Sequence, residues 1–144
     1  MAISFIGGTL SVSAAKPATE DASGYGALTW TEVGKVVTIG ELGDTAEDIT
    51  FDLLKTGRRV HVNGVKDVGD VPVTVEYDSS DAGQTIIKNG NNSNTVHSFR
   101  ITDPDGENWY FYGLIANRSI SQREANQYKG LTFVMRGQSG LTVV

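Results

Sequence analysis

The 144-residue sequence contains no cysteine, which excludes disulfide bonds and thiolate metal ligands. No apolar run approaches the length of a membrane-spanning helix. Basic residues are also scarce, since 12 Lys and Arg stand against 17 Asp and Glu and give a net charge of −5. This balance argues against tight binding of a phosphate backbone, although an acidic protein can still lie beside DNA without holding it.

What the sequence does contain favours β structure. Glycine is frequent, with 17 residues, and the alternating runs of Val, Thr, Ile and aromatic residues are short. The length suits one domain with a sizeable core. The N-terminus lacks a basic segment followed by an apolar one, so we expect no secretory signal. Together these features predict an all-β sandwich or barrel with one short helix.

The chain divides into three predicted parts. Residues 1–26 form an N-terminal arm with one plausible strand, residues 9–13. The arm carries too few apolar side chains to bury much by itself, so it is either loose or ordered by a neighbour. Residues 27–136 form the β-domain, and residues 137–144 a C-terminal tail that ends apolar. Within the domain, residues 49–53 alternate with period two and predict a half-buried strand. Residues 54–70 read as a long, basic, glycine-rich loop with at most a short strand, 59–62, inside it. We expect the arm and this loop to be disordered in a free monomer.

The most readable stretch of the sequence begins at residue 71. Residues 71–77 alternate apolar and polar side chains, which is typical of a half-buried strand. Asp81 followed by Gln84 resembles a capping box and predicts a helix over 81–89. Further on, residues 103–106 read Asp-Pro-Asp-Gly, the pattern of a type I turn, and they join two more strands into a hairpin.

The second strand of that hairpin, residues 108–117, is apolar on both faces. One face carries Trp109, Phe111 and Ile115, and the other carries Tyr110, Tyr112, Leu114 and Ala116. A sheet with one wet face alternates apolar with polar side chains, so here both faces must be covered. The helix or another subunit would cover the second face.

Residues suited to catalysis are few and scattered. His61 and His97 have no partner at metal-ligand spacing, and Ser13 with Lys16 matches a Ser-x-x-Lys pattern whose companion motifs are missing. The oxygen-rich stretch 103–108 lacks the spacing of a calcium loop, and a hairpin turn explains it. The sequence therefore predicts no catalytic residue, no cofactor site and no metal site.

One basic patch stands out, formed by Lys55, Arg58, Arg59 and Lys66. It has no aromatic residues among its charges, which argues against a surface for stacking nucleic-acid bases. Between subunits, this patch could face the acidic stretch 41–48, and complementary patches of that kind steer assembly.

The order of these features resembles the major tail tube protein of long, non-contractile bacteriophage tails. The resemblance spans most of residues 26–140, and its landmarks are Trp30-Thr31-Glu32-Val33, Glu76-Tyr77-Asp78, Asp81-Ala82-Gly83-Gln84 and the hairpin that opens with Phe99-Arg100-Ile101-Thr102. It implies a β-sandwich with a flanking helix, closed into hexameric rings by extending a sheet across subunits. Such closure would remove exposed strand edges.

The resemblance also implies a place and a set of partners. Stacked rings would form the hollow tube of the virion tail, made in the host bacterial cytoplasm, through which double-stranded DNA passes without specific binding. The partners implied are the chain itself, a tail-tip initiator, a tape measure protein and a tail terminator, with no membrane. Candidate contacts between subunits are Thr9, Leu10, Val12, Arg58, Arg59, Tyr110, Tyr112, Leu141 and Val143. Candidate lumen-facing residues are Thr50, Asp52, Thr74 and Glu76.

Two other interpretations stay open on the sequence alone. A tube protein of type VI secretion or of a contractile tail would share nearly all of these features. A monomeric carbohydrate-binding or adhesion β-sandwich would instead present an exposed aromatic platform. A hydrolase is the most distant alternative, since no residues with its chemistry are found together.

Overall fold

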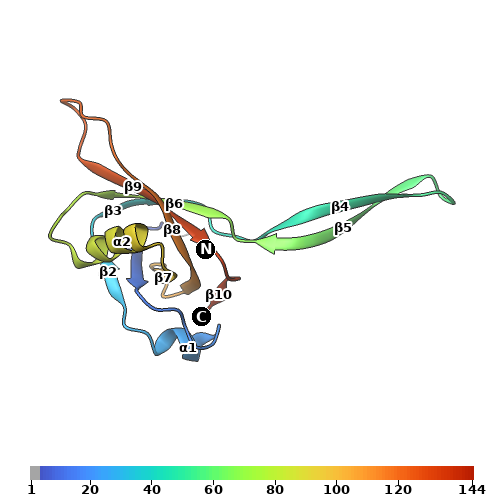
Figure 1. Cartoon of the computed structure of the whole chain (residues 1–144), viewed down its shortest axis with the longest axis horizontal. Helices are drawn as coiled ribbons and strands as arrows, with labels where there is room; N and C mark the ends of the chain where they lie inside the picture. The colour runs from blue at the N-terminus through green and yellow to red at the C-terminus, as the bar shows by residue number, and fades with distance from the viewer. Residues whose placement is uncertain (1–3) are drawn as a thin grey trace.

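The computed structural model describes residues 4–144 (Figure 1). Its elements, in chain order, are β1 (Thr9–Ser13), α1 (Ala22–Gly26), β2 (Thr31–Val33), β3 (Val36–Ile39), β4 (Thr45–Leu53), β5 (Arg58–Asp67), β6 (Asp70–Glu76), α2 (Ala82–Ser93), β7 (His97–Thr102), β8 (Asn108–Ile120), β9 (Gly130–Gly137) and β10 (Thr142–Val143). The predicted fold class, mainly β with a short helix, is confirmed, and the structure adds the second helix α1.

Eight strands form one continuous curled sheet in the order β2-β1-β7-β8-β9-β6-β3, with β10 alongside β8. The long strand β8 belongs to both halves, because residues 108–113 pair with β7 and residues 113–120 pair with β9. The two halves enclose an apolar core to which both contribute, including Phe99 and Phe111 from one half and Phe133 from the other. The sheet does not close, so β2 and β3 remain its edges.

Helix α2 begins where the sequence predicts and ends later. Asp81 caps it by accepting a hydrogen bond from the Gln84 amide. The predicted end at residue 89 is wrong, because the helix continues through Gly90 to Ser93 and ends at Asn94 in a left-handed conformation. Gly90 is needed for close packing instead: a Cβ there would lie 2.7 Å from His97 Cε1 and 2.8 Å from Ile115 Cδ1.

The Asp81 cap also ties the helix to the sheet, since its Oδ2 accepts from the Gly34 amide at 3.1 Å as well as from Gln84 at 3.0 Å. We expect Asp81→Ala to lower the free energy of unfolding by about 1–2 kcal/mol, the usual cost of losing an N-cap. Asp81→Asn keeps an acceptor oxygen and is the matched control. Urea denaturation measures both, and equal losses in the two variants would contradict a capping role.

The strand predicted at residues 9–13 is confirmed, but the segment around it is not a loose arm at this point. Residues 1–3 lie outside the described part of the chain, but β1 is an interior strand, paired with β2 on one side and β7 on the other. Leu10 and Val12 are fully buried. The expectation of a loose arm is therefore wrong for β1. Sequence composition misled because five residues suffice for a strand when two neighbours complete its hydrogen bonds.

The residues that follow β1 cover the outer face of β8. Tyr25 of α1 stacks on Tyr110 with ring centroids 4.9 Å apart, and Trp30 lies 5.8 Å from the same ring. The Lys16 ammonium sits 4.8 Å from the Tyr112 ring centroid. The two-faced apolar strand is thus covered on its second face by its own chain, over Tyr110 and Tyr112.

The largest correction concerns the predicted acidic and basic loops. Strands β4 and β5 pair over most of their length as a two-stranded antiparallel ribbon, with a register shift between Ala46 and Asp48. The ribbon projects far from the curled sheet (Figure 1). The expectation of a disordered loop over 54–70 is wrong, because the whole of β5 lies within it.

Candidate assembly interface

The β4–β5 ribbon has two chemically different faces. Directly paired residues share a face, so the pairs Ile49↔Val62, Phe51↔Val60 and Leu53↔Arg58 define one of them. Its apolar members are Ile49, Phe51, Leu53, Val60 and Val62, here called the ribbon apolar face. Phe51 is 47% exposed and Ile49 49%. These side chains are half in water, in a segment with no core of its own beneath it.

The opposite face of the ribbon is polar and internally paired. Arg59 Nε donates to Asp52 Oδ1 at 3.1 Å, and His61 Nδ1 lies 3.1 Å from both carboxylate oxygens of Asp48. Thr50 pairs with His61 across the strands. All these side chains are exposed, so the ion pairs contribute little stability. They do satisfy one another, which leaves the apolar face as the unpartnered side.

The end of the ribbon is basic. Leu54, fully exposed, opens the turn, and Lys55, Arg58 and Arg59 follow it; these three cations are here called the basic tip. Gly57 in this turn has φ +66, a left-handed conformation that favours glycine. Of the basic tip, only Arg59 has an ion-pair partner within the described residues, namely Asp52.

A second surface lies on the domain itself, beside edge strand β3. A groove of about 550 Å³ opens between β3 with its following residues, the start of β1 and the β7–β8 end of the sheet. Its walls are largely apolar: Phe5, Val36, Val37, Ile39, Leu42 and Trp109. Glu41 and Asp103 also line it. We call it the β3 groove, and none of its lining residues comes from the ribbon.

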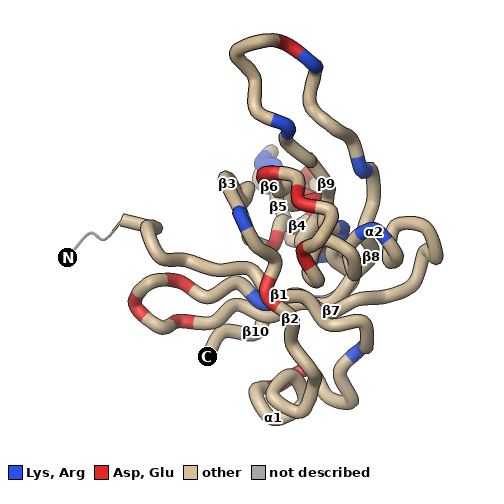
Figure 2. The backbone as a smooth tube through the Cα atoms, turned by 90° about the vertical axis from the view of Figure 1, so that its left-hand side faces the viewer, with Lys and Arg blue, Asp and Glu red and all other residues tan. Residues whose placement is uncertain are grey.

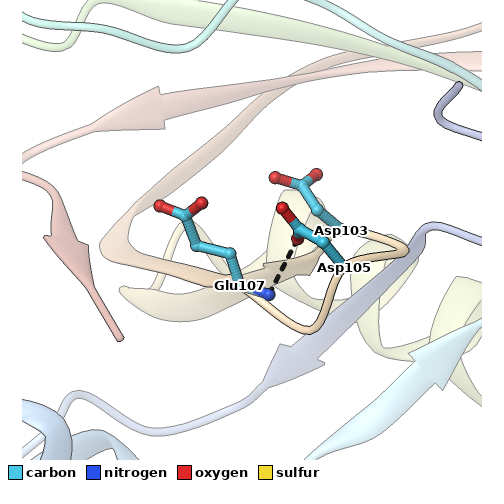
Figure 3. Close-up of side chains that lie close together, drawn as sticks. All are labelled: Asp103, Asp105 and Glu107. Carbon is cyan, nitrogen blue, oxygen red and sulfur yellow. Dashed lines mark hydrogen bonds between the residues drawn. The ribbon is translucent and has the colours of Figure 1, made fainter. Parts of the chain in front are cut away.

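Three carboxylates gather in the turn between β7 and β8, where Asp103, Asp105 and Glu107 offer oxygens within 4.8 Å of one another (Figure 3). The turn itself explains most of this cluster, here called the acidic turn. Asp105 Oδ1 accepts from the Glu107 amide at 3.1 Å, and Asp103 Oδ2 accepts from Trp109 Nε1 at 3.0 Å. The Gly106 amide donates to the Asp103 carbonyl at 2.9 Å, as predicted for this turn.

The structure separates the predicted contact residues into three groups. Leu10 and Val12 are fully buried within the chain, so their prediction as side-chain contacts between subunits is wrong. Tyr110 is 8% exposed beneath Tyr25, and it cannot serve either without moving α1. Residues that remain at least partly exposed are Thr9, Arg58, Arg59, Tyr112, Leu141 and Val143.

The predicted lumen residues fall on two surfaces. Thr50 and Asp52 belong to the polar face of the ribbon, whereas Thr74 and Glu76 lie on the outer face of β6, opposite its buried valines. The charges on this outer face are paired: Arg136 Nε donates to Asp70 at 3.0 Å, and Lys35 lies 3.9 Å from Glu76. The Asp70 carboxylate raises the pKa of Arg136 by hydrogen bonding.

Charge is dispersed over the rest of the surface. Figure 2 shows Lys and Arg positions scattered among the elements in that view rather than gathered on one face. His97 is buried next to Gly90, which fits a structural role. Within residues 4–144, no helix is long and apolar enough to span a membrane.

The sequence analysis predicted strands at 49–53 and 59–62, which lie in β4 and β5, but it did not predict their length or their pairing into a ribbon, and it missed the groove. A usable signal for the ribbon existed, because residues 49–53 and 59–62 both alternate and are separated by a short turn that contains Gly57. The groove had no such signal. It joins β3 to Phe5 and Trp109, which are far apart in sequence, and only the curl of the sheet brings them together.

Comparison with known proteins identifies the family. The phage tail tube protein (TTP) family matches residues 17–144. The chain belongs to the phage tail tube protein family. The resemblance stated from sequence is confirmed, and the chain is a structural component of a virion tail. A search of curated proteins found no significant match.

Solved structures share the tail tube fold at low sequence identity. The SPP1 tail tube matches with a TM-score of 0.70 and 15% identity, over 94% of this chain and 75% of that one. The tail of an empty GTA particle, refined with C6 symmetry, gives 0.71 and 14%, over 99% of both chains. A chain of the six-fold symmetrised anti-feeding prophage baseplate gives 0.71 and 10%, over 100% and 95%.

The covering of β8 by α1 makes a testable contribution to stability. The Tyr25 hydroxyl is buried without a hydrogen-bond partner, and burial raises the pKa of this phenol, outweighing the smaller opposing effect of nearby Ser139. Because the pKa of Tyr25 is higher in the folded state, the stability that the neutral phenol contributes is complete below its unfolded-state pKa near 10. That contribution is lost as the pH rises through the folded-state pKa.

We expect Tyr25→Phe to be as stable as the parent tail tube protein near neutral pH, because it removes an unsatisfied buried hydroxyl and keeps the ring stacked on Tyr110. Above about pH 10 the variant should lose less stability than the parent. Urea denaturation at the two pH values measures this, with the exposed Tyr128→Phe as control. An unchanged alkaline loss in Tyr25→Phe would show that this phenol is not its source.

Proposed function

We propose that this tail tube protein polymerises as stacked hexameric rings into a hollow tube that conducts double-stranded DNA during ejection. The observation that carries the proposal is the β4–β5 ribbon, whose apolar face is half exposed and lacks a core beneath it. An isolated two-stranded ribbon is only marginally stable in water. A second copy of the chain would supply the missing cover, and repetition of that contact would build the assembly.

The open sheet supports assembly through a second feature. Strands β2 and β3 are unpaired edges of the curled sheet, and exposed edges favour pairing with another chain. In a ring each edge would meet a neighbour, so closure would leave no edge exposed within the ring. Six subunits are supported by the symmetry of the GTA tail and of the anti-feeding prophage baseplate, whose chains share this fold.

For the lumen, we propose the outer face of β6 with Thr74 and Glu76, together with Thr50 and Asp52 of the ribbon. Paired charges, such as Arg136 with Asp70, leave few free cations on the β6 face. With a net charge of −5, the chain would repel rather than hold a phosphate backbone. Weak contact suits a conduit, since each tight phosphate contact would slow the DNA.

The proposed partners are further copies of the chain, a tail-tip initiator, a tape measure protein and a tail terminator. In this role the protein acts as a structural element and not as an enzyme. A baseplate chain of the anti-feeding prophage shares the fold, which supports contact with components at the end of a tail. A chain of an extracellular contractile injection system also shares the fold, which keeps a tube of the contractile or secretion type as a second candidate function.

Negative-stain electron microscopy of the purified chain tests the proposal, first alone and then with the tail-tip complex. We expect hollow tubes of uniform diameter, with six-fold averages in end views. Isolated rings that never stack would favour the secretion type. A chain that stays monomeric even with the tip complex would contradict the tube function, and glycan binding would then be screened.

A further inference from the structure

We propose that the β3 groove receives the ribbon apolar face and the basic tip of a second copy of the chain. The inference rests on the proposed tube function and adds the surface that the ribbon occupies. Two unpartnered surfaces of one molecule, a projecting ribbon and a groove, would then be the two halves of one repeated contact.

The first argument is that the ribbon and the groove both expose apolar side chains. The ribbon offers a stripe in which Ile49, Phe51 and Val62 are each exposed by 46–49%. The groove offers apolar walls that include Val37, which is 56% exposed, and Phe5, which is 77% exposed. Contiguous exposed apolar surface of this kind marks interaction sites in soluble proteins. Docking removes both surfaces from water at once, which neither can achieve within its own chain.

Charge complementarity is the second argument, and it also fixes the direction of docking. Arg58 pairs with Leu53 and therefore lies on the apolar face, at its outer end, with Lys55 in the adjoining turn. The β3 groove is lined at its margin by Glu41 and Asp103, and the acidic turn adds two more carboxylates beside Asp103. A cationic end on an apolar stripe thus matches an apolar groove with an anionic margin.

The same match explains the acidic turn without a metal ion, because the cations of a second chain would balance its carboxylates. Asp103 and Asp105 each use one carboxylate oxygen within the turn, whereas no hydrogen bond or ion pair of the described residues involves the Glu107 carboxylate. These oxygens are available to the guanidinium of Arg58 and the ammonium of Lys55 from a neighbouring chain. The geometry therefore points to a second copy as the source of the cations.

A chain cannot satisfy this contact alone. The ribbon leaves the domain directly after Leu42, which lines the groove, and projects away from the sheet (Figure 1). The contact is heterologous, because the two surfaces differ, and such contacts repeat into rings or filaments rather than stopping at a dimer. One surface pair can in this way drive growth of the tube.

The absence of cysteine makes the contact directly measurable by cross-linking. A chain carrying Val62→Cys on the ribbon apolar face and Val37→Cys in the groove is assembled and treated with a short thiol-to-thiol cross-linker. We expect a ladder of covalent multimers, since each chain then links head to tail. The matched control carries Thr50→Cys with Val37→Cys and places its thiol on the polar face; it should give little ladder.

The result separates this inference from the tube function. Tubes seen by electron microscopy with a ladder only in the Val62 variant support the docking. Tubes with no ladder, or with equal ladders in both variants, overturn the docking and leave the function standing. Absence of tubes from the unmodified chain with its tip complex contradicts the function itself.

If the cysteine variants fail to assemble, exchanging the charges of the basic tip and the groove tests the docking. Lys55→Glu with Arg58→Glu should slow tube growth started by the tail-tip complex, in the absence of parental seeds, at least tenfold. Combining them with Glu41→Lys and Glu107→Lys in the same chain should restore growth. Failure of the second pair to restore any growth, with both chains folded by circular dichroism, overturns the proposed docking.

Discussion

Replacing Ile49 and Phe51 with aspartate should abolish tube formation while leaving the free chain folded. Both side chains lie on the ribbon apolar face, about half exposed, and neither belongs to the buried core. In the monomer the new carboxylates stay hydrated, so the unfolding free energy should change by less than about 1 kcal/mol. In a docked ribbon, each carboxylate would be buried without a partner, a state that is strongly unfavourable.

The measurement is seeded growth followed by electron microscopy, with urea denaturation of the monomer alongside. Thr50→Asp with Asn63→Asp is the matched control, since it adds the same charge to the polar face of the same ribbon. The control should retain much of its growth. Normal tubes from the Ile49 and Phe51 variant would show that the apolar face is not an interface, whatever role the rest of the ribbon has.

Local patterns were sufficient to predict the elements that depend on local interactions. The helix after Asp81 follows from its N-cap, which accepts from the Gln84 amide. The reciprocal half of the capping box does not form, because the Gln84 side chain accepts from the Asp78 amide at 2.9 Å and the Asp81 amide donates to the Asp78 carbonyl. The β7–β8 turn follows from Pro104 and Gly106 in fixed positions. Such signals need only neighbours in sequence, and that is why they were readable.

The features that could not be predicted depend on distant partners. The strand at residues 9–13 was predicted, but its interior position depends on pairing with β7, whose residues lie nearly ninety positions away, as in Ser11↔Arg100. Strands were predicted at 49–53 and 59–62, but the charges of Asp48, Asp52 and Arg59 hid how far these strands extend and that they pair. Their charges are satisfied across the strands, a compensation that composition does not reveal. The candidate contacts between subunits could not be predicted for the same reason, since burial of Leu10 and Val12 depends on the whole sheet.

Replacement of Gly113 by alanine should cause a large loss of stability, roughly 3 kcal/mol. Gly113 stands where β8 changes partners, paired with His97 of β7 on one side and with Gly137 of β9 on the other. A Cβ atom there would overlap the backbone carbonyl oxygen of Arg136 and lie 3.0 Å from the Gly137 Cα. These are backbone atoms of a paired strand, so no side-chain rotation relieves the clash.

Urea denaturation measures the loss, and Gly26→Ala is the control, because a Cβ on Gly26 meets nothing within 4 Å. That variant should stay within about 1 kcal/mol of the parent. A Gly113→Ala chain of parental stability would mean that β8 and β9 separate easily at this corner. The outcome bears on assembly as well: the corner sets the angle between the two halves of the sheet, and the β3 groove contains residues of both. A chain with an altered corner should therefore join tubes poorly even at temperatures where it remains folded.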